Sequence, residues 1–131
     1  MSKIKKKKYK LSKVQEIFNK YIRKRDSKDG YFECISCGKI LPIEKMNAGH
    51  YVPVSRSSFL RFHEWNVSGE CSYDNGFNEF HLIGYRRNLI EKIGLTAVEW
   101  LEKMEQDVKL HQWKQHELTE IAEMYKEEKN E

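Results

Sequence analysis

The stretch Cys34-Ile35-Ser36-Cys37-Gly38 opens a segment that holds every cysteine of the chain and closes on Cys71-Ser72-Tyr73-Asp74-Asn75. The spacing is Cys-x-x-Cys, then 33 residues, then Cys-x-x-Asp. A tight turn with two thiolates and a glycine at the backbone bend is typical of a zinc knuckle, and structural zinc takes four ligands in a tetrahedron. The spacing therefore predicts a structural zinc site made of Cys34, Cys37, Cys71 and Asp74.

Asp74 is the least certain ligand by chemistry. Aspartate can bind zinc through oxygen, but three thiolates with one carboxylate make a harder and weaker site than four thiolates. The alternative is that Asp74 only caps the N-terminus of a helix, with His63, His81 or water as the fourth ligand. The residues alone leave both readings open.

The composition indicates one small domain that depends on such a site. Of the 131 residues, 39% are hydrophobic and 34% are charged, so few are available for a core. Small cores usually need a metal or disulfides, and three cysteines do not close a disulfide framework. We find no signal-peptide pattern and no apolar run of membrane-spanning length. We therefore expect a cytoplasmic protein with reduced thiols and no membrane partner.

Charge is distributed unevenly along the chain. Residues 1–28 hold twelve Lys and Arg residues and two acidic residues, a net of +10, whereas the whole chain has a net charge of +4. The other 103 residues therefore sum to −6. A basic arm on a mildly acidic body favours contact with a polyanion such as nucleic acid, and the alternative is a solvated tail.

Hydrophobic periodicity and turn signals predict an α+β protein with three parts. We expect a disordered basic arm over residues 1–10, a zinc-stabilised core with a leading helix over 11–95, and a C-terminal helical extension over 96–131. The leading helix runs from Leu11 to about residues 26–28. Short strands are expected at 31–33, 39–43, 47–54 and 62–67, with Trp65 on a buried face and a turn at 68–69. Further helices are expected at 74–93, from residue 96 to a break near 110–113, and from about residue 115.

His50, Asn66 and Asn75 form a second set of residues with possible chemistry. Phosphodiester hydrolysis needs a base that activates water and a divalent metal that stabilises charge on the phosphate. Asparagine is a modest neutral ligand that suits Mg²⁺ held partly by substrate phosphate. From the residues alone the structural alternative is stronger, because a single histidine is more often structural and an asparagine at a helix start is more often a cap.

Seven short stretches, in order over roughly residues 11–95, together resemble the phage NinG/Rap recombination protein family. They are FNKYIRKRD (18–26), CISCG (34–38), AGHY (48–51), LRF (60–62), NV (66–67), CxxxN (71–75) and YRxxLIxxIG (85–94). The resemblance implies an HNH-like (ββα-metal) endonuclease with a treble-clef zinc knuckle, which cuts branched DNA such as D-loops and four-way (Holliday) junctions. It also implies an N-terminal helix, while the C-terminal helices match only loosely.

The resemblance assigns roles to single residues. It places the general base on His50 and has Asn66 orient that base or hold the loop. Asn75, and also His81 on the same helix, would bind a catalytic Mg²⁺ or Mn²⁺, while Zn²⁺ would occupy the knuckle.

The sequence departs from the family pattern at three positions. The pattern has Asp near Asn47, His near Ser68 and Cys at Asp74. These departures leave open a variant, slow or inactive enzyme, and His81 could compensate in part.

The expected DNA-facing residues are the basic arm together with Arg23, Arg25, Arg56, Arg61, Arg86 and Arg87. Junctions are recognised by shape and phosphate placement, so base readout is not required. The alternative is that these are ordinary surface arginines.

The sequence therefore predicts a metal-dependent endonuclease that acts on branched DNA recombination intermediates in a bacterial or phage-infected host cell. Its partner is branched DNA, and a homodimer joined through the C-terminal helices is possible. The alternative is a non-catalytic zinc-stabilised module that binds branched or single-stranded DNA. A zinc-stabilised protein-interaction domain is a third possibility.

Overall fold

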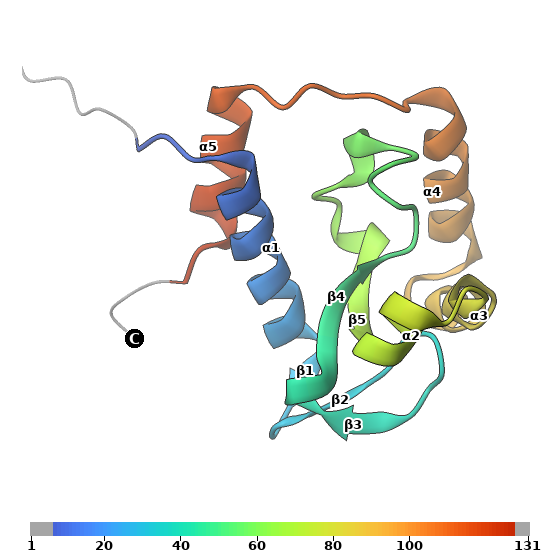
Figure 1. Ribbon diagram of the computed structural model, residues 1–131. Helices are drawn as coiled ribbons and strands as arrows, with labels where there is room; N and C mark the ends of the chain where they lie inside the picture. Colours follow the sequence, from blue (N-terminus) through green and yellow to red (C-terminus); the bar gives the residue numbers. More distant parts are fainter. Residues whose placement is uncertain (1–6, 128–131) are drawn as a thin grey trace, which may run out of the picture.

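Two small antiparallel sheets lie among five helices in the computed structural model, which describes residues 7–127 (Figure 1). The predicted α+β class is confirmed. The helices are α1 (Leu11–Arg25), α2 (Ser72–Phe77), α3 (His81–Ile93), α4 (Leu95–Asp107) and α5 (Gln115–Tyr125). The strands are β1 (Ser27–Lys28), β2 (Tyr31–Glu33), β3 (Ile40–Pro42), β4 (Met46–His50) and β5 (Val67–Cys71), and short 3-10 turns occupy Ile43–Lys45, Ser58–Leu60 and Glu64–Asn66.

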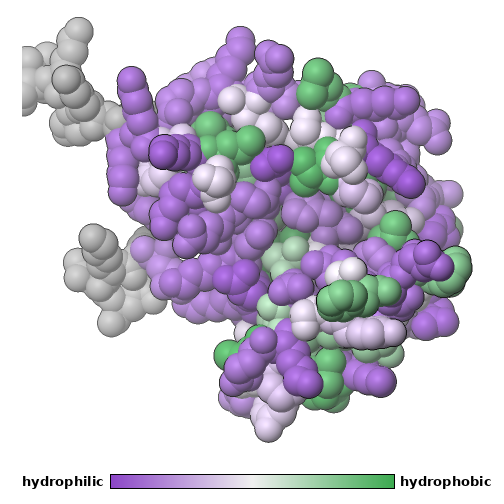
Figure 2. Space-filling model, in the orientation of Figure 1, coloured by the Kyte–Doolittle hydropathy of each residue, from purple (hydrophilic) through white to green (hydrophobic). Residues whose placement is uncertain are grey.

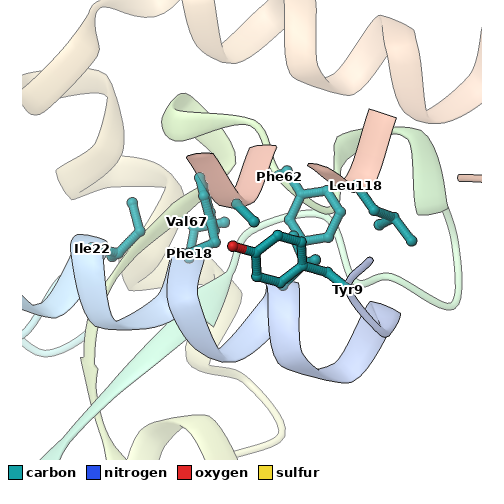
Figure 3. Close-up of a cluster of buried hydrophobic side chains, with 8 residues drawn as sticks. Tyr9, Phe18, Ile22, Phe62, Val67 and Leu118 are labelled. Carbon is teal, nitrogen blue, oxygen red and sulfur yellow. The ribbon is translucent and has the colours of Figure 1, made fainter. Parts of the chain in front are cut away.

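The first core joins α1 to α5 and to the β4–β5 pair. The apolar stripe of α1 recurs at four-residue spacing, and its members Val14, Phe18 and Ile22 are fully buried. Phe18 packs edge-on against Phe62, with ring centroids 5.8 Å apart. Leu118 of α5 closes the cluster (Figure 3), and α1 and α5 lie side by side in Figure 1. Residues on both sides of the expected boundary at residue 95 therefore share one core, and the three-part division stays a prediction.

The expected disorder of residues 1–10 does not extend to Tyr9. Its side chain is buried in the first core, and its backbone N–H donates to the Gln115 side chain at 2.7 Å. Its hydroxyl donates to Glu123 at 2.9 Å, so an aromatic residue just before α1 joins this end of the chain to α5. Residues 1–6 lie outside the described residues.

The second core lies between the loop after β4 and the helices α3 and α4. Tyr85 and Leu89 of α3 and Val98 and Leu101 of α4 are fully buried there. Gly94 has φ +93°, a conformation that favours glycine, and it separates α3 from α4. The predicted break before the last helix is confirmed, because α4 ends at Asp107 and α5 begins at Gln115.

Three expectations about local structure were wrong. The helix expected over 74–93 is divided by residues 78–80, where the Asn78 side chain bonds Asp74 and accepts from the Phe80 N–H, which competes with the helical pattern. The stretch before Val67 forms a 3-10 turn in place of a strand, and it leaves Trp65 42% exposed. The expected turn at 68–69 lies inside β5, because both residues pair with β4.

Candidate metal centre and nuclease site

The ligand atoms of Cys34, Cys37, Cys71 and Asp74 all lie within 4.8 Å of one another. Asp74 Oδ2 is 3.4 Å from Cys34 Sγ and 3.2 Å from Cys71 Sγ. A tetrahedral zinc with bonds of about 2.0–2.3 Å separates its ligands by about 3.3–3.8 Å, so these four side chains are spaced as the ligands of one ion would be. The structure therefore contains a Cys₃Asp cluster that could bind a metal such as zinc.

Asp74 points into the cluster and does not cap the helix. The N-cap of α2 is Cys71, whose sulfur accepts from the Asp74 N–H. The other proposed fourth ligands lie elsewhere, since His63 packs against Trp65 and His81 contacts Glu70. The four residues predicted from spacing are thus the ones that the fold brings together.

The thiols and the carboxylate of the cluster differ in their protonation. Burial raises the pKa of the Cys71 thiol to about 12 and that of the Cys37 thiol to about 11. Burial alone would raise the pKa of the Asp74 carboxyl, but hydrogen bonds from Asn78 and the cysteine thiols outweigh it and lower that pKa. The protein without metal therefore holds the neutral Cys37 and Cys71 thiols beside the Asp74 carboxylate, and a metal ion would displace these thiol protons on binding.

Helix α3 packs against the turn Cys34–Cys37, which carries two of the four possible ligands. A Cβ at Gly84 would collide with the Ser36 carbonyl oxygen, so only glycine allows α3 to approach the knuckle this closely. The Asn88 side chain donates to the Ile35 carbonyl at 2.8 Å. Glycine inside a helix is unfavourable compared with alanine, and this close contact explains its place in α3.

His50 ends β4, and a single hydrogen bond holds its ring. Nε2 lies 3.0 Å from the Arg61 carbonyl oxygen. Because a carbonyl only accepts, Nε2 must carry the proton, and Nδ1 of the neutral ring is then the basic nitrogen. Nδ1 has no hydrogen-bond partner among residues 7–127 and is not sealed from solvent. Burial lowers the pKa of His50, which favours the neutral ring.

Asn66 is fully buried and holds the loop between β4 and β5. Its amide oxygen accepts from the Val52 N–H at 2.8 Å, and its amide nitrogen donates to the Val52 and Leu60 carbonyls. These contacts close the loop that carries Arg61 back onto the end of β4. Of the two roles that the resemblance allows for Asn66, the structure supports holding the loop. Asn75 is exposed on α2, and within residues 7–127 its side chain forms no hydrogen bond with His50 or Asn66.

His81 begins α3 and contacts a residue that the sequence did not reveal. Its Nδ1 lies 2.5 Å from Oε2 of Glu70, a residue of β5 that is fully buried. An acidic residue between Gly69 and Cys71 carries no local signal of function, because its partners come from other segments. The strand alternation that places Glu70 opposite Asn47 could have indicated its face, but not its partners.

Two of the predicted DNA-facing arginines serve the fold. Arg25 forms an ion pair with Asp26 at 2.8 Å and donates to the carbonyls of Glu64 and Val67. Arg86 pairs with Glu102 at 2.8 Å.

The remaining arginines are more available to a partner. Arg56 is exposed and faces Glu105 at 3.4 Å, and Arg61 reaches Gln15 at 3.4 Å. Arg23 is half-buried and Arg87 is exposed. Their contact with DNA stays a prediction.

The surface around α2 also carries exposed aromatic side chains. Tyr73 is 66% exposed and Phe77 is 82% exposed. The face in Figure 2 is mostly hydrophilic, with separate apolar patches.

The expected homodimer stays a prediction. None of the helices within residues 7–127 has the length and apolarity to span a bilayer.

Fold and site together define a small α+β protein with a Cys₃Asp cluster suited to a metal ion. Comparison with known proteins assigns the chain to a family within this class. The family described as "Bacteriophage Lambda NinG protein" matches residues 1–131, and the chain belongs to this family.

Several phage proteins are similar to the chain. Protein ninG of Salmonella phage P22 is 34% identical over 119 residues, which cover 91% of this chain and 55% of that protein. Protein ninG of Escherichia phage lambda is 32% identical over 119 residues, with 91% and 55% covered. The chain thus spans about half the length of the curated relatives it matches. No solved structure matches it.

Proposed function

We propose that this protein is a metal-dependent endonuclease that acts on branched DNA, with zinc in the Cys₃Asp cluster as a structural ion. His50 is the general base, and Asn75 and His81 contribute ligands for a catalytic Mg²⁺ or Mn²⁺. A divalent cation bound beside the substrate phosphate would stabilise the charge that develops on its oxygens. The matched family gives the chain its family membership. The nuclease activity and the branched-DNA substrate are part of our proposal.

The state of His50 carries the proposal. A general base must be unprotonated on the nitrogen that faces water, and its orientation must be fixed. The Arg61 carbonyl meets both needs, because it fixes the proton on Nε2 and leaves Nδ1 basic. Asn66 supports this contact indirectly, since it closes the loop on which Arg61 lies. A histidine with a purely structural role would more often have both ring nitrogens bonded.

The proposed step uses His50 of this chain to remove the proton from water. His50 Nδ1 takes a proton from the water that attacks the phosphorus, while the Nε2–H bond to the Arg61 carbonyl is kept. The bond from phosphorus to the leaving ester oxygen breaks, and that oxygen takes a proton from solvent water. The imidazolium that forms is stabilised by this carbonyl dipole. Exposed basic residues such as Arg56 and Arg87 would hold the flanking phosphates.

The test is a cleavage assay on a four-way junction and a linear duplex of the same sequence, in Mg²⁺, Mn²⁺ and EDTA. The zinc content of each preparation is measured first. His50→Ala is compared with His116→Ala, which removes an exposed histidine on α5. We expect junction cleavage that needs divalent metal, survives His116→Ala and falls by about 100-fold or more in His50→Ala.

Two results would count against the proposal. Cleavage that survives His50→Ala at the wild-type rate excludes His50 as the base. Tight junction binding without cleavage in any metal identifies the non-catalytic binding module instead.

A further inference from the structure

Glu70 is a buried carboxylate whose contacts are incomplete. The residue is 0% exposed on β5. Its Oε2 accepts from the Ser36 hydroxyl and from His81 Nδ1, whereas its Oε1 has no partner within residues 7–127. A buried carboxylate is costly unless its oxygens are paired, so this arrangement calls for a function or for further compensation of its charge.

Gly49 makes the room that this carboxylate occupies. A Cβ at Gly49 would collide with Glu70 Oε1 and would lie 3.2 Å from Glu70 Cδ. Gly49 has no positive φ that would require glycine, so the absence of a side chain matters here for space. Glycine at position 49 therefore leaves room for the carboxylate over this part of β4.

The contact with Glu70 decides the tautomer of His81. A carboxylate only accepts, so Nδ1 of His81 carries the proton and Nε2 of the neutral ring keeps its lone pair. The His81 side chain is 19% exposed, and Nε2 has no hydrogen-bond partner among the described residues and is not sealed from solvent. Histidines that bind metals characteristically donate their other ring N–H to a carboxylate or carbonyl in this way.

We propose that Glu70 and His81 form a carboxylate–imidazole pair that presents His81 Nε2 to a divalent cation. Glu70 is the positioning residue of this site and acts through His81. The negative charge of the buried carboxylate favours a cation nearby, and of the two ions of the proposed reaction Mn²⁺ accepts an imidazole nitrogen more readily than the harder Mg²⁺. The role of the pair in cleavage rests on the proposed function, but cation binding can be measured without DNA.

The first test measures Mn²⁺ binding by zinc-loaded protein by isothermal titration calorimetry. The variants are His81→Ala, Glu70→Gln and Glu33→Gln, where Glu33→Gln removes an exposed carboxylate from β2 as the matched control. We expect Glu70→Gln to weaken Mn²⁺ binding by about 10–100-fold and Glu33→Gln to leave it unchanged. In the double variant Glu70→Gln/His81→Ala, binding should be no weaker than in His81→Ala, because Glu70 acts through His81.

The second test reports on the ring itself. In ¹⁵N spectra of the wild type, the neutral His81 ring should carry its proton on Nδ1, and Glu70→Gln should shift the population towards the Nε2–H form. Trace Mn²⁺ should broaden the His81 ring signals before those of exposed His116, which serves as an internal control. Gly49→Ala, which keeps the carboxylate but displaces it, should weaken Mn²⁺ binding in the same direction as Glu70→Gln.

The outcomes separate this inference from the proposed function. Unchanged Mn²⁺ affinity and an unchanged His81 tautomer in folded, zinc-loaded Glu70→Gln would overturn the pair, even if the wild type cleaves DNA. Losses in Glu70→Gln and His81→Ala that simply add would show that Glu70 acts elsewhere. Mn²⁺ binding with the expected losses, in a protein that cleaves no DNA, would support the site and refute only the nuclease.

Discussion

Substitution of Gly84 by alanine tests the packing of α3 on the zinc knuckle. Within a helix, alanine is more favourable than glycine by about 0.8–1.0 kcal/mol, so the local effect is stabilising. The new Cβ, however, would collide with the Ser36 carbonyl oxygen and lie 3.2 Å from the Ser36 carbonyl carbon, and both belong to backbone that cannot rotate away. Overpacking of this kind costs about 1–3 kcal/mol. We therefore expect Gly84→Ala to lose about 1–2 kcal/mol of unfolding free energy, or about 4–8 °C in Tm for a chain of this size.

Gly76→Ala is the matched control, because a Cβ there meets no atom within 4 Å and the position is also helical. It should gain up to about 1 kcal/mol, so the two variants should differ by about 1–3 kcal/mol. The assay is urea unfolding of zinc-loaded protein, with zinc content measured before each experiment, and the m-value should stay constant. Gly84→Ala that is as stable as the wild type, with zinc retained, would refute the close contact between α3 and the knuckle.

Three further predictions follow from the metal cluster, from His50 and from the arginines. Asp74→Cys completes a four-thiolate site and should bind zinc more tightly than the wild type, whereas Asp74→Asn should bind it more weakly, as measured by competition with a chromogenic chelator. Burial lowers the pKa of His50 in the folded state. Below about pH 6.5 the unfolded chain therefore binds more protons than the folded chain, so the free energy of unfolding should rise with pH up to about 6.5 and then level off. His50→Gln should flatten this rise in urea unfolding curves recorded between pH 5 and pH 7, and an unchanged slope would exclude His50 as its source. Arg25→Ala should destabilise the fold, because Arg25 contacts Asp26 and the carbonyls of Glu64 and Val67. Arg87 is exposed, so Arg87→Ala should leave the free energy of unfolding unchanged and should reduce the salt dependence of junction binding by about one ion.

The metal cluster could be predicted from the sequence because its information is local. Two cysteines on one tight turn and a Cys-x-x-Asp pair at a helix start each define half of a tetrahedral site, whatever the rest of the fold is. The placement of Asp74 follows from Cys71, whose sulfur takes the helix-capping role and leaves the carboxylate free to face the thiols. The sequence could not decide between the two roles, because both put an aspartate at the same position.

Contacts between distant segments could not be predicted from the pattern. Arg25 has the sequence context of a basic helix end, but it folds back onto carbonyls at Glu64 and Val67, some forty residues away. Glu70 resembles any acidic residue in a short strand until the fold places Ser36 and His81 beside it. The stretch around Trp65 has a strand-like pattern, but it forms a 3-10 turn over Glu64–Asn66, and β5 begins at Val67. Each error concerns a residue whose environment is set by tertiary contacts.

The position of Glu70 bears on Asn47, one of the three positions at which the sequence departs from the pattern of the family that it resembles. The resemblance to the NinG/Rap family predicts a carboxylate near position 47, and this chain has an amide there. Asn47 and Glu70 are directly opposite each other in the β4–β5 pair, so their side chains share one face and their Cβ atoms lie about 4.5–5.5 Å apart. A carboxylate on β5 can therefore serve the same space as one on β4, provided that Gly49 leaves that space open. We propose that Glu70, acting through His81, supplies negative charge on the face where the resemblance would place a carboxylate from position 47. Asn47→Asp in the Glu70→Gln background should then recover part of the Mn²⁺ affinity that Glu70→Gln loses, whereas no recovery would mean that the two positions do not share one site.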